Sequence, residues 1–105
     1  LFDNNKKATN FMSCFSLCSN TTLNKNIFSN EGSTDRFSGM NMRFNHCFQH
    51  AGKDSTNPGE APELWKYERG GSTWNTTGCF DNANATNLTL DYEYNTEWGT
   101  PLNWN

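Results

Sequence analysis

Residues 87–95 read Asn-Leu-Thr-Leu-Asp-Tyr-Glu-Tyr-Asn. Leucine and tyrosine alternate there with polar residues, and this period of two is typical of a β-strand with one apolar face. Residues 64–68 and 73–80 carry similar aromatic-rich patterns, and the short connection Arg69-Gly70-Gly71 between them is typical of a hairpin. The three segments together predict an antiparallel three-stranded meander.

The residues before this meander predict further β structure and one ambiguous element. Alternation over residues 37–48 predicts a strand in which Cys47 points away from the apolar face. Residues 51–62 are rich in Gly, Pro, Asn and Asp and predict a loop. In residues 10–19 the apolar spacing fits a short helix, which we favour, but Phe11, Phe15 and Leu17 also fit a strand. No internal repeat of 20 to 50 residues is apparent.

Length and composition predict a single domain with a small core. The chain has 105 residues, of which 33% are hydrophobic, so little apolar surface is available for burial. We therefore expect an all-β fold: a small antiparallel β-sandwich-like domain over residues 1–105, with the short helix near residues 10–19 as its one helical element. It would act outside the cell, either alone or as a module of a larger protein.

The four cysteines predict cross-links. Cys14, Cys18, Cys47 and Cys79 form an even set in a polar chain rich in Asn, Ser and Thr, which suits an oxidising compartment. We expect two intramolecular disulfides. All three pairings stay open, although a Cys14–Cys18 bridge would close too small a loop to constrain much. The spacing lacks the paired ligands of a zinc site, so no metal is expected.

Charge and hydropathy exclude two classes of partner. The net charge is −3 and the eight Lys and Arg are scattered, which disfavours nucleic acid. No stretch has the 18 or more apolar residues of a membrane span. No motif predicts a cofactor. We expect a secreted, extracellular protein.

Four Asn-x-Ser/Thr acceptor sites predict glycosylation, at Asn20, Asn75, Asn84 and Asn87. Asn87 falls on the solvent-exposed face of the last predicted strand. Asn84 falls in a polar turn, and Asn20 at the start of a polar stretch. Asn75 adjoins Trp74 inside a predicted strand, so we expect it to be the least accessible of the four.

The titratable residues do not predict catalysis. His46 and His50 would share one face of a strand at a separation of about 13 Å, too far apart to bind one metal ion. Asp91 and Glu93 share a face of the last predicted strand, and a pair of carboxylates is what a glycosidase uses, but no pattern around them indicates a cleft. The chain is therefore not expected to be an enzyme.

Aromatic side chains are the best candidates for a binding surface: Trp65, Trp74, Trp98, Trp104 and Tyr67. A chain with few aliphatic residues uses some rings in its core and leaves others exposed, where they stack on sugars or form interfaces. Residues 96–105 carry several large apolar groups and would pack against their own meander or add a strand to a neighbouring molecule.

The sequence thus predicts a non-enzymatic secreted glycoprotein module. Its role would be extracellular structure, adhesion or self-assembly, as a fibre or matrix subunit, with a copy of itself or an extracellular matrix or surface protein as partner. The alternative is a carbohydrate-binding, lectin-like module whose exposed Trp and Tyr residues contact a glycan ligand. A secreted enzyme or inhibitor is the third hypothesis.

Overall fold

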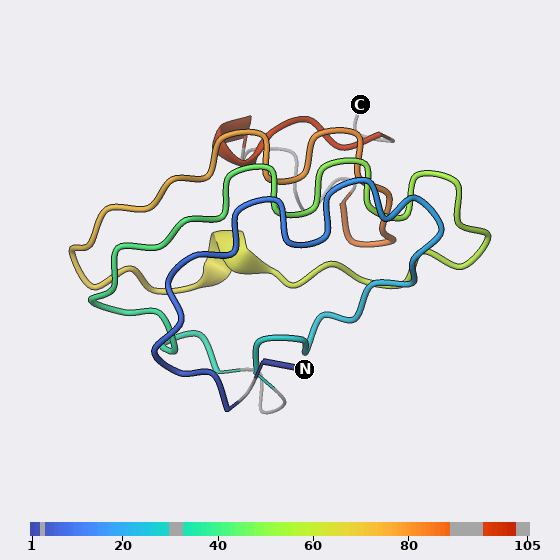
Figure 1. The fold of residues 1–105 in the computed structure, drawn as a ribbon. Helices are drawn as coiled ribbons and strands as arrows, with labels where there is room; N and C mark the ends of the chain where they lie inside the picture. The colour runs from blue at the N-terminus through green and yellow to red at the C-terminus, as the bar shows by residue number, and fades with distance from the viewer. Residues whose placement is uncertain (3, 30–32, 89–95, 103–105) are drawn as a thin grey trace.

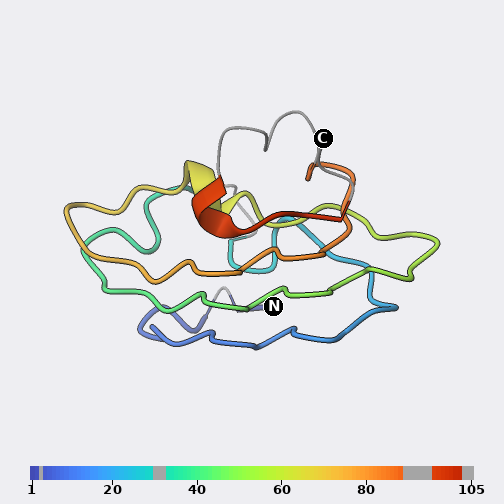
Figure 2. The ribbon, with the colours of Figure 1, turned by 90° about the horizontal axis from the view of Figure 1, so that it is seen from above.

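The chain folds as a short stack of coils. Our computed structural model describes residues 1–2, 4–29, 33–88 and 96–102. Figure 1 shows three wave-like segments, coloured blue, green and orange, that run side by side along one face of the molecule. Figure 2 shows from above that these segments form consecutive layers, with the red C-terminal segment on the last one. The described residues form a solenoid of three coils, which begin at Asn10, Arg43 and Asn75.

Each coil begins with a series of overlapping tight turns, which we call a turn ribbon. The first, second and third turn ribbons comprise residues 10–18, 43–51 and 75–83. Within each ribbon, alternate amides donate to the carbonyl three residues earlier: Cys14 to Phe11, Ser16 to Ser13, Cys18 to Phe15, Cys47 to Phe44, Gln49 to His46, Ala51 to Phe48, Cys79 to Thr76, Asp81 to Gly78 and Ala83 to Phe80. These bonds are the i to i+3 bonds of β-turns.

Left-handed residues recur at matching places in the three ribbons. They are Ser13 and Leu17 in the first, His46 and His50 in the second, and Gly78 and Asn82 in the third, with φ between 55° and 65°. A positive φ at the third residue of a turn is the mark of a type II turn, which favours Gly or Asn. The ribbons therefore share one backbone conformation, although only the third ribbon has the residues that this conformation prefers.

Adjacent ribbons pair in parallel and in register. The odd-numbered amides of the first ribbon donate to the second: Phe11 to Arg43, Ser13 to Asn45, Phe15 to Cys47 and Leu17 to Gln49, at 2.7–3.1 Å. The second ribbon donates to the third in the same way: Phe44 to Asn75, His46 to Thr77, Phe48 to Cys79 and His50 to Asp81, at 2.8–2.9 Å. Hydrogen bonds between the coils thus run in one direction along the middle of each ribbon. At the start of the second and third ribbons the direction reverses, because Arg43 donates to Thr9 and Asn75 donates to Met42.

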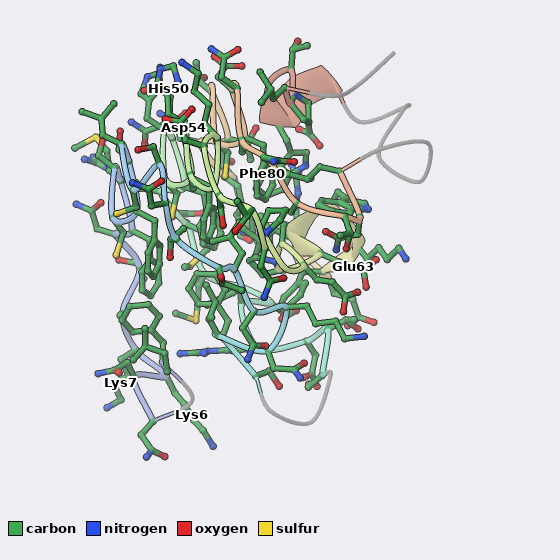
Figure 3. The ribbon with its side chains drawn as sticks, turned by 90° about the vertical axis from the view of Figure 1, so that its right-hand side faces the viewer. Lys6, Lys7, His50, Asp54, Glu63 and Phe80 are labelled. Carbon is green, nitrogen blue, oxygen red and sulfur yellow. The ribbon has the colours of Figure 1, made fainter. Side chains whose placement is uncertain are left out.

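Aromatic rings stack inside the coils. Phe15 and Phe48 lie face to face with ring centroids 5.1 Å apart, and Phe48 and Phe80 follow at 5.3 Å. This repeat is close to the spacing of about 4.8 Å between paired backbones. Phe80 lies in the interior, whereas His50 and Asp54 lie at one end of the view in Figure 3 and Lys6 and Lys7 at the other. The stacked rings form the core that the scarce aliphatic residues do not supply.

The rest of each coil returns around this core with little regular structure. The parallel bridge between Leu23 and Gly59 joins the first two coils on the return side. Gly59 is required there, because its φ is +71° and a Cβ would lie 2.1 Å from the Leu23 carbonyl oxygen. A 3-10 helix, η1 (Leu64–Lys66), buries Leu64. The guanidinium of Arg36 lies over the Phe37 ring, 5.0 Å from its centroid, and donates to the carbonyls of Phe2 and Phe28.

The last turn ribbon is covered by the C-terminal segment. The 3-10 helix η3 (Thr96–Trp98) leads into residues 98–102, which accept from Phe80 and Asn82 and donate from Leu102 to Ala83. The side chain of Trp98, at the start of this segment, is fully buried. The described C-terminal residues therefore pack on the third turn ribbon rather than on the predicted meander.

The predicted all-β sandwich is wrong. Among the described residues there is no β-strand, only three isolated bridges, and all three are parallel rather than antiparallel. Residues 64–68 contain η1 instead of a strand. Residues 75–83 pair with residues 43–51 rather than forming a hairpin with residues 64–68. The last predicted strand lies mostly outside the described residues.

The predicted helix at residues 10–19 is also wrong, but the pattern behind it has a physical meaning. In the third ribbon the buried side chains are Thr76, Cys79, Phe80 and Ala83. A series of four-residue turns faces the core at i, i+3, i+4 and i+7, as an amphipathic helix does. The same spacing in the second ribbon buries Cys47 beside Phe48, which is why the two-residue alternation predicted for this segment fails.

The structure reveals the repeat that the sequence analysis missed. Asn10 bridges to Arg43 and Arg43 to Asn75, at separations of 33 and 32 residues. The signal in the sequence is a Cys-Phe pair at residues 14–15, 47–48 and 79–80, followed three residues later by Cys or Ala. So short a motif is hard to see when the rest of each coil varies in composition.

The two predicted disulfides are wrong. All four cysteines, Cys14, Cys18, Cys47 and Cys79, are free thiols. Cys14, Cys47 and Cys79 occupy matching positions in consecutive ribbons, and matching side chains of parallel in-register backbones point the same way rather than toward each other. Cys47 and Cys79 are fully buried and pack as small apolar residues.

Candidate functional site

The first turn ribbon differs from the other two in its exposure. Cys47 and Cys79 are 0% exposed, whereas Cys14 at the matching position is exposed. Phe15 is half-buried, although Phe48 above it is fully buried. Inward-facing positions of the first ribbon therefore remain accessible on the side that has no neighbouring coil.

The backbone of this ribbon presents a row of hydrogen-bond acceptors. In the second ribbon the carbonyls of Arg43, Asn45, Cys47 and Gln49 accept from the coil before it. The matching carbonyls of the first ribbon are those of Asn10, Met12, Cys14 and Ser16, and none accepts a hydrogen bond from another described residue. We call these four carbonyls the acceptor edge. Repetition of the same turns directs them away from the second coil.

The amides between these carbonyls are already used inside the ribbon. The Met12 amide donates to the Asn10 side-chain oxygen at 3.0 Å, and the Cys14 and Ser16 amides donate to carbonyls three residues earlier. Only the Asn10 amide has no described acceptor, and the matching Arg43 amide donates back to Thr9 of the preceding coil. The edge therefore offers acceptors along its length and one donor at its start.

Exposed apolar side chains gather on the first coil and the segment before it. Of the four large hydrophobic residues exposed in the described part of the chain, Leu1, Met12 and Leu17 lie there, and their exposures are 74%, 48% and 72%. Leu102, exposed by 41%, lies at the opposite end of the stack. Exposed apolar groups beside unpaired acceptors are typical of a surface that binds another chain.

The predicted aromatic surface is mostly core. Trp98 is 0% exposed and Trp74 is 7% exposed. The Arg69 guanidinium lies over the Trp74 ring, 5.0 Å from its centroid, and also pairs with Glu97 at 2.7 Å. Trp65 is half-buried with its ring edge-on to Phe80, Tyr67 is half-buried on the Phe37 ring, and Trp104 lies outside the described residues. The structure does not bring these residues together on one face.

The thiols are poor nucleophiles where they are buried. Burial, and to a lesser degree the neighbouring Cys14, raises the pKa of the Cys47 thiol. Burial raises the pKa of Cys79 well above its ordinary value, and the neighbouring Cys47 adds to this rise. Both sulfurs therefore stay protonated at neutral pH, and a protonated thiol neither attacks a substrate nor binds a metal ion readily.

His46 and His50 hold left-handed positions of the second ribbon rather than positions along a strand. The His46 ring packs against the backbone of Gly78, where a Cβ would lie 2.7 Å from its Nδ1 atom. No group of three or more His, Cys, Asp or Glu side chains that could hold a metal gathers in the part of the chain that the structure describes. Asp91 and Glu93 lie outside that part.

The four predicted glycosylation sites differ in accessibility. Asn20 and Asn75 are exposed, whereas Asn84 and Asn87 are half-buried. The Asn87 amide is bound on both sides by Ala61: its nitrogen donates to the Ala61 carbonyl and its oxygen accepts from the Ala61 amide, each at 2.8 Å. The sugar-accepting nitrogen is therefore more accessible at Asn75 than at Asn87, the opposite of what the predicted strands imply.

Sequence reasoning also missed an open groove beside the start of the three ribbons. It has a volume of about 680 Å³, and its lining includes Met12, Arg43, Asn45, Trp74, Asn75 and Thr77. The Asn45 side-chain oxygen is buried there without a hydrogen-bond partner among the described residues.

Comparison of the chain with protein-family models, curated proteins and solved structures found no match. No helix in the described residues has the length and apolar character needed to cross a membrane.

Proposed function

We propose that this chain is a non-enzymatic structural module of an extracellular assembly, and that it works by binding through the exposed face of its first coil. The observation that supports this proposal most directly is the stacking of three equivalent turn ribbons in parallel and in register. Stacked repeats of this kind contact only their neighbours and serve as extended binding or structural surfaces.

The chemistry of the side chains supports binding rather than turnover. The buried thiols have raised pKa values because of desolvation, and the His46 ring packs against backbone. Three of the four large hydrophobic residues exposed in the described part of the chain lie instead on the first coil and the segment before it, and the open backbone acceptors lie on the same coil. The extracellular location is part of the proposal, and it rests on the polar composition and the four glycosylation sites.

The carbohydrate-binding alternative has lost two of the five aromatic residues it rested on, because Trp74 and Trp98 belong to the core. A glycan ligand would have to bind in the groove beside the ribbons or against the half-buried Trp65.

Surface binding measurements test the proposal. Intact protein immobilised through its C-terminal end is offered a soluble copy of itself, purified collagen, fibronectin and laminin, and a glycan array. We expect saturable binding of a protein partner that weakens by about tenfold or more in the Met12→Asp/Leu17→Asp double variant, because charges at a desolvated contact are costly. Leu102→Asp is the matched control at the opposite end and should leave binding unchanged.

Two results would contradict the proposal. Binding confined to glycans, and lost in Trp65→Ala while the fold survives, would move the chain to the lectin class. Absence of binding to every protein offered, the soluble copy included, would remove the structural role.

A further inference from the structure

We propose that the acceptor edge of the first turn ribbon binds another turn ribbon of the same type, which adds a coil to the stack. This inference deepens the proposed function and rests on it, because it names the chemistry of the partner. The evidence is the match between the interface that would form and the two interfaces between coils that the molecule already contains.

The hydrogen-bonding groups select this partner over an ordinary β-strand. A strand presents both amides and carbonyls along one edge. Its carbonyls would face the acceptor edge, where the Met12, Cys14 and Ser16 amides are already bonded within the ribbon. Such a contact leaves carbonyls unsatisfied, and each buried unpaired group costs about 1–3 kcal/mol.

A turn ribbon avoids this cost. Along the middle of its donor side it presents amides only, as the second ribbon does with Phe44, His46, Phe48 and His50, and a carbonyl accepts from the next coil only at the ribbon's last residue, Ala51. Its matching carbonyls accept within the ribbon, as the Phe44, His46 and Phe48 carbonyls do. Four amides would therefore meet the four open carbonyls, in the arrangement that already joins the first ribbon to the second.

The side chains on the exposed face fit the same partner. Cys14, Phe15 and Cys18 occupy positions where the later ribbons bury Cys, Phe and Ala completely. A phenylalanine of an added ribbon would extend the ring stack that runs through Phe15 and Phe48 at 5.1 Å. The added coil would thus bury the part of the core that is still open.

Two copies of this chain do not supply this contact directly. Two acceptor edges placed face to face would oppose carbonyl to carbonyl. The donor side of the third ribbon is covered by residues 98–102, to which Phe80 and Asn82 already donate and in which the Trp98 side chain is fully buried. The partner is therefore a turn ribbon whose donor side is open.

An added coil can be built from the chain itself. Asn10 and Asn75 are equivalent, because the side-chain oxygen of each accepts from the amide two residues later. Lys66 lies as far before Asn75 as Leu1 lies before Asn10. A copy of residues 43–65 joined directly to Leu1 of the full chain therefore recreates the 32-residue spacing between Arg43 and Asn75.

The experiment compares this extended protein with one in which the added residues are scrambled. In both proteins the added residues carry Cys47→Ser, so that the extension contributes no thiol of its own. The rate of Cys14 alkylation is then measured by peptide mapping after timed exposure to the reagent. We expect alkylation of Cys14 to slow by about tenfold or more in the ordered extension and to stay unchanged in the scrambled one, because an added coil covers Cys14 as Cys47 is covered. Slow alkylation of Cys79 shows that the original coils remain folded.

A second pair of variants joins the same extensions to Leu1 through a flexible Gly-Ser linker, in case direct fusion disturbs the coils. Protection of Cys14 by the ordered copy in either pair supports the proposal. A pair of variants counts only when Cys79 stays protected in both members. The proposal is overturned when, in every pair that counts, Cys14 is alkylated at the same rate with the ordered and the scrambled copy. Binding of the unextended chain to matrix proteins is measured separately, so the proposed function can stand when this inference fails.

Discussion

The first and second turn ribbons have the same backbone and opposite environments. Both use three overlapping turns with left-handed residues at the fourth and eighth positions of the ribbon, yet Cys14 is exposed where Cys47 is fully buried. The second ribbon has a coil on each side and the first has a coil on one side only. Burial in this molecule is therefore set by neighbouring coils, and not by the ribbon itself.

Thiol reactivity gives the largest expected contrast between the ribbons. Without reductant, Cys14 and Cys18 should be alkylated in the native protein, while Cys47 and Cys79 should react slower by about a thousandfold, since they become accessible only when the coils open. In denaturant all four should react. Mass spectrometry counts the adducts. Fewer than four adducts on the unfolded, unreduced chain would show that some cysteines are linked in disulfides, as the sequence predicted.

Truncation of stacked rings should separate the same two ribbons by stability. Phe48→Ala removes a fully buried ring between two others and should cost about 3–5 kcal/mol of unfolding free energy. Phe15→Ala, at the matching half-buried position, should cost about 1–2 kcal/mol. Urea denaturation measures both. Equal losses would mean that the first ribbon is already covered in solution.

Glycine replacement tests the close contact between the second and third ribbons. At Gly78 a Cβ would meet the His46 ring at 2.7 Å and the φ of +62° is unfavourable, so Gly78→Ala should cost about 2–4 kcal/mol. Gly71 has a φ of +80° but open space around it, so Gly71→Ala should cost about 1 kcal/mol from the backbone alone. Thermal unfolding of the two variants compares them, and an equal shift would argue against the packing of His46 on Gly78.

The smallest expected effect is a gain of stability. Leu17 is exposed with a φ of +65°, a conformation that costs a side chain with a Cβ about 1–2 kcal/mol. Leu17→Gly should therefore raise the unfolding free energy by about 0.5–1 kcal/mol after the entropy of the unfolded chain is counted. Met12→Gly, with no positive φ to relieve, should lower it. Loss of stability in both variants would contradict the turn geometry of the first ribbon.

The inward positions were partly predictable from sequence, but the element that holds them was not. Phe11, Cys14, Phe15 and Cys18 stand out at helical spacing, and turns of four residues produce nearly the same spacing. The turn ribbon differs from a helix in the left-handed conformation at residues such as Ser13, Leu17 and His46. Serine, leucine and histidine do not predict that conformation. The glycine and asparagine of the third ribbon were the only local signal.

The binding surface could not be predicted, because it depends on pairing between distant residues. The carbonyls of Met12 and Cys14 are open only because no coil precedes the first ribbon in the structure. Some tryptophans were expected to be exposed, because the chain has few aliphatic residues. Trp74 and Trp98 instead fill the core in place of aliphatic side chains, and the Arg69 guanidinium lies over both rings. Composition alone does not separate a ring that fills a core from one that binds a ligand.

The central claim is that the second and third ribbons pair in parallel, in register. Nuclear magnetic resonance couplings across hydrogen bonds measure this pairing directly. We predict couplings from the amide nitrogens of Phe44, His46 and Phe48 to the carbonyl carbons of Asn75, Thr77 and Cys79, respectively. Absence of these couplings, with couplings instead between residues 64–68 and 73–80 in antiparallel order, would contradict the stacked coils and support a meander.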